Sequence, residues 1–122
     1  MGYQELIEFM QQKAGFTDIE AEEVLDLMVE SIAERLDDYE REDFASLLPI
    51  ELQETVYSAE IPAANEQEQD FVHEFMDKED IEENEAKKQV TTAWETLKSI
   101  ITDADIQRIK SELPKHIAAS LG

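Results

Sequence analysis

Apolar residues between Thr17 and Leu36 recur at the spacing that places them on one side of an α-helix. They are Ala21, Val24, Leu25, Met28, Val29, Ile32 and Leu36. This face is wider than the narrow seam of a coiled coil, so we expect a central helix that neighbours contact on more than one side. Thr17 and Glu20 have the spacing of a capping box, in which each side chain accepts a hydrogen bond from the other residue's backbone N–H, and they predict where the helix begins.

A second run with the same pattern lies 65 positions further along the chain, from Glu82 to Ile101. Trp94 takes the place of Val29 on its apolar face, and we expect this tryptophan to pack in the core. The other apolar positions of this run are Ala86, Val90, Ala93, Leu97 and Ile101. We therefore expect two tandem repeats, residues 1–57 and residues 69–122, joined by a connection over residues 58–68.

Shorter helices are predicted around each long helix. In the first repeat they run from Tyr3 to about Lys13, from Asp37 or Asp38 to Leu47, and onward from Pro49, with an inner face of Ile50, Leu52 and Val56. In the second repeat they run from Asp70 to Asp77 and onward from Thr102 and Pro114. Gly15 stands where a left-handed residue would end the first helix.

These elements predict an all-α protein, a single helical bundle of about eight helices built from two four-helix repeats. Hydrophobic residues make up 42% of the chain, while three Gly and three Pro are too few for an all-β protein with many tight turns. Repeats of about 55 residues would each be marginally stable alone. We therefore expect residues 1–122 to form a single domain with one shared core.

Several segments carry a family resemblance. They are Ala14–Phe16, Glu20–Ala21, Glu34–Leu36 and Leu47–Leu52, which read AGF, EA, ERL and LLPIEL. With them the chain resembles the bacterial family catalogued as domain of unknown function 2267. The resemblance implies a tandem-repeat helical fold, and it brings no catalytic motif, cofactor or substrate.

The net charge limits the classes of partner. It is −21, from 31 acidic and 10 basic residues. Nucleic acids are bound largely through Lys and Arg that displace counterions, so this charge opposes direct binding to DNA or RNA. It also repels anionic lipids, and no apolar run approaches the roughly 18 to 20 residues that span a bilayer. With no cysteine and no signal-peptide pattern at the N-terminus, we expect a cytoplasmic protein without a nucleic-acid or membrane partner.

Motifs for metal binding and catalysis are missing from the sequence. The acidic run from Asp77 to Glu85 has no Gly for the turn of a calcium loop, and we interpret it as a solvated helix start. Neither His73 nor His116 follows a Glu by three positions, as a di-iron bundle requires. No G-x-S-x-G segment is present. We expect no metal, no cofactor and no enzymatic activity, and keep a metal-binding or enzymatic bundle as the less favoured alternative.

One polar surface differs between the repeats. The outer side of the first long helix forms an acidic stripe of Glu22, Glu23, Asp26, Glu30 and Glu34, whereas the equivalent positions of the second carry Lys87, Lys88, Thr91, Glu95 and Ser99. The stripe is either a solubilising face or a docking surface for a basic protein partner. The docking surface predicts a non-enzymatic interaction module for a basic partner, and the alternative function is a homo-oligomeric structural protein. We expect the chain to be a monomer or a homodimer. We also expect crowded carboxylates to have raised pKa values.

Overall fold

The computed structural model describes residues 2–60 and 69–121 of the chain. These residues form eight α-helices and no strand, which confirms the predicted all-α class and the number of helices. Most of the expected connection, residues 61–68, lies outside the described residues. In chain order the helices are α1 (Tyr3–Ala14), α2 (Asp18–Ala33), α3 (Asp38–Ser46), α4 (Ile50–Ser58), α6 (Phe71–Glu79), α7 (Glu83–Lys98), α8 (Asp103–Glu112) and α9 (Lys115–Ala119).

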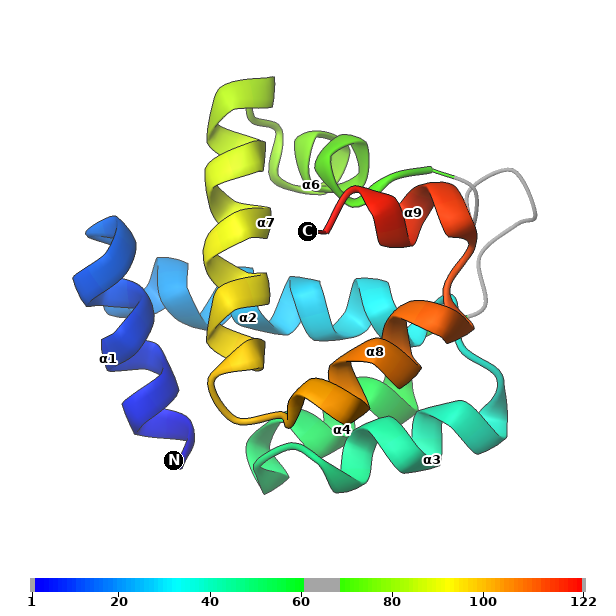
Figure 1. Ribbon diagram of the computed structural model, residues 1–122. Helices are drawn as coiled ribbons and strands as arrows, with labels where there is room; N and C mark the ends of the chain where they lie inside the picture. Colours follow the sequence, from blue (N-terminus) through cyan, green and yellow to red (C-terminus); the bar gives the residue numbers. More distant parts are fainter. Residues whose placement is uncertain (1, 61–68, 122) are drawn as a thin grey trace.

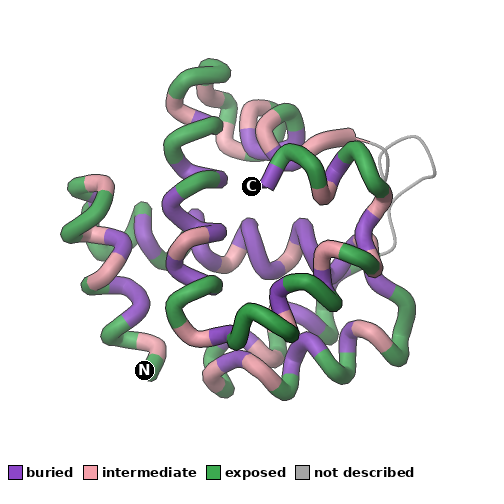
Figure 2. Tube along the Cα trace, viewed as in Figure 1, coloured by how far each residue is buried: buried purple, intermediate pink, exposed green. Residues whose placement is uncertain are grey.

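Helix α2 lies at the centre of the molecule. It is contacted by α1, α4, α6 and α7, and α7 crosses it steeply (Figure 1). All seven apolar residues predicted on its inner face are buried, as are Leu27, Ser31 and Ala33 on its other sides. Figure 2 shows burial along nearly the whole helix. The expectation of a helix packed on more than one side is confirmed.

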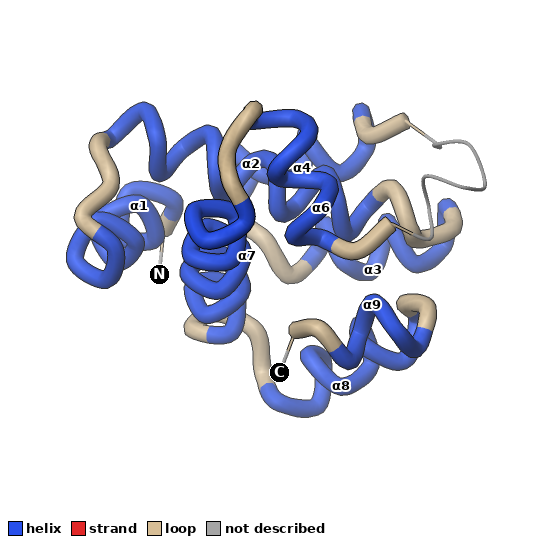
Figure 3. The backbone as a smooth tube through the Cα atoms, turned by 90° about the horizontal axis from the view of Figure 1, so that it is seen from above, coloured by secondary structure: helices blue, strands red, loops and turns tan. Residues whose placement is uncertain are grey.

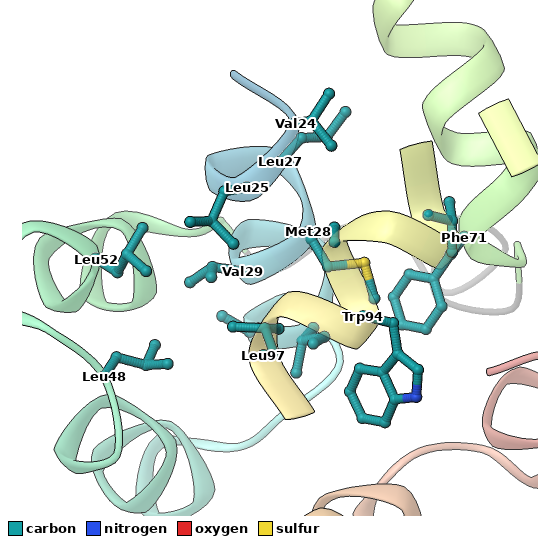
Figure 4. Packing of buried hydrophobic residues seen from close by; sticks show 14 of the residues in the cluster. Val24, Leu25, Leu27, Met28, Val29, Leu48, Leu52, Phe71, Trp94 and Leu97 are labelled. Carbon is teal, nitrogen blue, oxygen red and sulfur yellow. The ribbon is translucent and has the colours of Figure 1, made fainter. Parts of the chain in front are cut away.

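Helix α7 supplies the second half of the core. All six apolar residues predicted between Glu82 and Ile101 are buried, and Trp94 is 2% exposed. The Met28 side chain of α2 reaches toward the ring of Phe71 of α6, and Trp94 lies beside them in the packed interior (Figure 4). Buried residues from both halves of the chain belong to one hydrophobic cluster. In the view from above, α8 and α9 lie together at one side of the molecule, at the bottom of Figure 3. They add Ile106, Ile109 and Ile117 to this cluster.

Local side chains mark where the helices begin. Thr17 Oγ1 accepts from the backbone N–H of Glu20 at 3.1 Å, and Glu20 Oε1 accepts from that of Thr17 at 3.3 Å, which confirms the predicted capping box. Asp37 and Glu40 form the same box at α3, whereas at α8 the Thr102 side chain accepts from the backbone N–H of Asp105. Glu82 precedes α7 without a side-chain cap. Most of these helix starts are therefore determined by a hydrogen bond between residues three positions apart.

Three expectations need correction. The two long helices end at Ala33 and Lys98, earlier than Leu36 and Ile101, because the chain tightens there into turns with hydrogen bonds three residues apart. Leu36 and Ile101 are nevertheless buried. Ile50 was expected on the inner face of α4 but is 77% exposed. It lies two residues before the buried Leu52, and two steps of about 100° place it on the opposite side of the helix.

Helix boundaries recur at the separation of 65 positions. The residues that precede α2, α3 and α4 are Thr17, Asp37 and Pro49, and those that precede α7, α8 and α9 are Glu82, Thr102 and Pro114. The residues after α1 and α6, Gly15 and Asp80, are both left-handed, with φ of 71° and 53°. This register supports the predicted repeat.

The left-handed residue at the end of α6 gives a first prediction. An L-residue in this conformation is strained, because its Cβ approaches the following carbonyl oxygen. We expect the Asp80→Gly variant to be more stable than the Asp80→Asn variant by about 0.5–1 kcal/mol. Both variants lose the same charge, so urea unfolding of the pair isolates the backbone term. Equal midpoints would show that Asp80 is unstrained.

The central position of α2 gives a second prediction. Leu25 is fully buried, and Leu25→Ala should cost about 2–5 kcal/mol because a cavity remains. Glu23 is exposed on the same helix, and Glu23→Ala should change the free energy of unfolding by less than about 0.5 kcal/mol. Chemical unfolding measures both variants. Similar small losses at the two positions would contradict the central role of α2.

Candidate functional site

The structure divides the predicted acidic stripe. Glu22 and Glu23 are exposed, Asp26 and Glu30 are half-buried, and Glu34 is 8% exposed. The expectation that all five residues lie on an outer face is therefore wrong for Glu34. Helix α6 packs against α2, and its side chains reach the Glu30 and Glu34 end of the stripe.

The Lys78 ammonium of α6 lies among three carboxylates. Its Nζ is 2.9 Å from Glu34 Oε1, 3.0 Å from Glu74 Oε2 and 3.4 Å from Glu30 Oε1. An ammonium has three N–H donors, so one lysine can serve all three acids. We refer to Glu30, Glu34, Arg35, Glu74 and Lys78 as the α2–α6 ion cluster.

Arg35 holds the buried side of this cluster. Its side chain is 1% exposed, and its Nη2 is 2.8 Å from Glu74 Oε1. It also donates to the backbone carbonyls of Ser31 at 2.6 Å and Gln69 at 2.5 Å. The guanidinium lies 4.7 Å from the centre of the Phe71 ring. Arg35 therefore joins α2 to the chain that enters α6, a role that sequence reasoning missed.

The two buried carboxyls of the cluster differ in protonation. Burial and a hydrogen bond to Glu74 raise the pKa of Glu34 to about 7. Burial also acts to raise the pKa of Glu74, but hydrogen bonds from Glu34 and Lys78 and the charge of Arg35 outweigh it and lower that pKa. Of the two carboxyls, Glu34 is therefore the one that binds a proton at the higher pH. A glutamic acid that titrates near neutral pH is unusual, because its ordinary value is close to 4.5.

The other end of the stripe joins a neighbouring helix. Burial raises the pKa of Tyr3 to about 12, and the negative charges of Asp26 and Glu22 on α2 and of Glu51 on α4 add to this effect. Asp26 Oδ1 accepts a hydrogen bond of 3.4 Å from Thr55 of α4. Within residues 2–60 and 69–121, no basic side chain forms an ion pair with Glu22, Asp26 or Glu51. We call Tyr3, Glu22, Asp26 and Glu51 the open acidic face.

We expected neighbouring negative charges to raise the pKa values of the acidic side chains, but the main cause of the raised values is burial. The pKa is raised at Asp26, Glu34, Glu79 and Glu112, but burial is the largest cause at each, ahead of neighbouring charges. It is lowered at Asp70, where hydrogen bonds from His73 outweigh burial. The distribution of pKa values therefore follows the packing of the helices more than the density of acids along the sequence.

A half-open groove of about 400 Å³ lies between α6, α7 and α9. Its charges are already matched, because Asp70 pairs with His73 at 2.7 Å and Glu83 with Lys87 at 3.0 Å. Ser120 also lines the groove, and its hydroxyl donates to the carbonyl of Ile117 at 2.6 Å. In the described part of the chain no hydrogen bond links His73 to this hydroxyl, as a nucleophile and its base require.

The acidic run from Asp77 to Glu85 is divided between two helices. Asp77 and Glu79 belong to the last turn of α6, Asp80 forms the turn, and Glu83 and Glu85 lie in the first turn of α7. Its interpretation as a helix start alone was therefore incomplete. Across residues 2–60 and 69–121, no group of three or more His, Cys, Asp or Glu side chains is arranged to hold a metal ion.

Comparisons with known proteins identify a family and no function. The family model described as uncharacterized conserved protein (DUF2267) matches residues 3–120. No curated protein and no solved structure matches the chain. Among the described helices, none combines the length and the apolar character needed to cross a membrane.

The ion cluster gives a third prediction. Arg35→Met should cost about 3–5 kcal/mol, because it leaves the Glu74 carboxylate buried without its guanidinium partner. Arg108→Met is the matched control, since Arg108 pairs with Asp105 on the surface of α8, and it should cost less than about 1 kcal/mol. Urea unfolding at pH 7 compares the two variants. Equal losses would mean that Arg35 contributes no more than a surface arginine.

Proposed function

The chain belongs to the DUF2267 family, and since that family is described only as an uncharacterized conserved protein, we propose a function from the geometry of this chain's own surface. The protein is a non-enzymatic interaction module that docks a basic segment of a partner protein on the open acidic face. The observation that carries the proposal is that three carboxylates from α2 and α4 all act on the pKa of the Tyr3 hydroxyl, while within residues 2–60 and 69–121 none of the three forms an ion pair.

The ion cluster shows how this protein holds a lysine. Glu30 lies in the last turn of α2, Glu34 directly follows that helix, and Glu74 comes from the neighbouring α6. All three contact Lys78 Nζ. The open acidic face repeats this composition, with Glu22 and Asp26 four residues apart on α2 and Glu51 from the neighbouring α4. A lysine or arginine of a partner would find there the kind of carboxylate set that Lys78 occupies.

Electrostatics favours such a partner in two ways. Like charges four residues apart on a helix cost about 0.2–0.5 kcal/mol per pair, and a bound cation removes that cost. The net charge of −21 also steers basic molecules toward the protein and raises their association rate at low salt. The Tyr3 hydroxyl, protonated at neutral pH, is a hydrogen-bond donor or acceptor at the centre of the face.

Charge reversal on the open acidic face gives a fourth prediction. The Glu22→Lys, Glu51→Lys double variant should lose at least about tenfold in affinity for a basic partner captured by wild-type protein from its native cell at low salt. Both residues are exposed, so the fold should persist. Affinity purification followed by mass spectrometry identifies the partner, and titration of the purified pair measures the affinity.

The matched control places the same charge change elsewhere. Asp38 and Glu42 are exposed and four residues apart on α3, and the Asp38→Lys, Glu42→Lys variant should keep the partner. The wild-type complex should also weaken as salt is added, because about 0.15 M salt already screens charges beyond ~8 Å. Equal loss in both charge-reversed variants would mean that only the total charge matters and that the open acidic face is no docking site.

A further inference from the structure

We propose that the Glu34–Glu74 carboxyl pair is a proton-dependent latch between α2 and α6, closed when Glu34 carries a proton and loosened when Glu34 ionises. This inference concerns the internal packing of the protein and is independent of the docking of a partner. It assigns a conformational role to the α2–α6 ion cluster, which takes no part in the proposed docking on the open acidic face.

The geometry of Glu74 fixes which carboxyl is ionised. Glu74 Oε2 accepts from Ser31 Oγ at 2.9 Å and from Lys78 at 3.0 Å, while Oε1 faces Arg35 Nη2 at 2.8 Å. Three donors from both helices therefore hold Glu74 as a carboxylate. Glu34 Oε1 and Glu74 Oε2 both contact the Lys78 ammonium, at 2.9 Å and 3.0 Å, so the two buried carboxyls lie side by side, and the pair is stable there when one of them is protonated. The proton therefore resides on Glu34.

The charges that face Glu34 balance only in the protonated state. From α2 they are Glu30 and Arg35, and from α6 they are Glu74 and Lys78. With Glu34 neutral, two cations meet two anions. Ionisation adds a third carboxylate beside Glu74, in a place where Glu34 and Glu74 are 8% and 4% exposed and water screens little.

The other helices around α2 do not supply a further cation. Arg41 of α3 lies at this end of α2, but its guanidinium donates to the carbonyls of Ala33, Ala59 and Glu60. Among the described residues, no ion pair joins Glu34 to α1, α4 or α7. The two cations within reach of Glu34, Lys78 at 2.9 Å and Arg35 at 3.9 Å, are already paired with Glu74. The ionised Glu34 therefore turns toward solvent with Lys78, whose side chain is 40% exposed, and moves away from Glu74.

The equivalent contact in the other half shows that the fold does not require the cluster. Lys13 lies 65 positions before Lys78, and Glu95 lies 65 positions after Glu30. These two residues join α1 to α7 in an ion pair of 3.0 Å. At the same separation, the residues that correspond to Glu34, Arg35 and Glu74 are Ser99, Ile100 and Phe9, and none of these is charged. A buried ionic cluster often adds no stability over apolar packing, so its presence at one contact alone favours a switching role.

The expected pH dependence has a definite sign. The folded-state pKa of Glu34 is raised to about 7 from its ordinary 4.5, so its stabilising contribution is fully present below pH 4.5 and is lost as pH rises through 7. Between pH 6 and pH 8 these two values make opening of the latch about tenfold more favourable. Hydrogen exchange of the α6 amides, expressed as protection factors, measures this opening.

The test compares wild type with Glu34→Gln, in which the amide donates permanently to Glu74. We expect protection of the α6 amides in wild type to fall about tenfold more than in Glu34→Gln between pH 6 and pH 8. Glu30→Gln is the matched control, because it removes an acid of the cluster that does not bond Glu74, and it should behave as wild type. His73 on α6 titrates in the same range, but it is present in every protein compared and cancels.

Two outcomes would overturn the latch. The first is the same fall in protection in wild type and Glu34→Gln. The second needs no variant: the side-chain carboxyl signal of Glu34, followed by NMR in the wild-type protein, titrates near pH 4.5. A midpoint near pH 7 together with a pH-independent Glu34→Gln variant supports the proposal.

Discussion

Water is excluded from almost every side of α2, and the polar groups of that helix therefore need partners inside the protein. Ser31, which is fully buried, donates to Glu74, and Glu34 and Glu74 both contact the Lys78 ammonium. Where α6 covers α2, each acid is protonated, paired or hydrogen-bonded. Where α2 meets water, Glu22 and Glu23 have no ion pair or hydrogen bond from their carboxylates to another described residue. The cover on the helix thus determines which of its acids are available for recognition.

Two of the three arginines secure the C-terminal end of α2. Arg41 is 8% exposed, and its Nε donates to the carbonyl of Ala33 at 2.8 Å while Nη1 donates to that of Ala59 at 2.6 Å. Carbonyls at a helix C-terminus lack intrahelical partners and carry partial negative charge, so a buried guanidinium is stabilised there without a carboxylate. Arg35 donates to the carbonyl of Ser31 in the last turn of α2 and to that of Gln69 before α6, and it also pairs with Glu74. These contacts join α2 to α3, to the end of α4 and to the start of α6.

The sequence predicted what depends on neighbours three or four residues away. Helix starts at Thr17, Asp37 and Thr102, and the buried faces of both long helices, follow from this local spacing. The burial of Glu34 depends on Lys78, which is 44 positions away, and helical periodicity carries no information on such a contact. A signal was nevertheless present: Lys13 and Glu95 lie 65 positions from Lys78 and Glu30, and each of the two lysines pairs with a glutamate in the other half of the chain.

The division of the acidic stripe sets what a partner must provide. The ion pairs of Lys78 are strong because Glu34 and Glu74 are buried away from water. Glu22 and Glu51 are exposed, and their charges act through solvent. Attraction by charge alone is screened within ~8 Å at physiological salt and would not distinguish one basic protein from another. A specific partner therefore has to exclude water around the open acidic face and satisfy the Tyr3 hydroxyl, because only desolvated, fully paired groups there discriminate between a fitting basic segment and a merely cationic one.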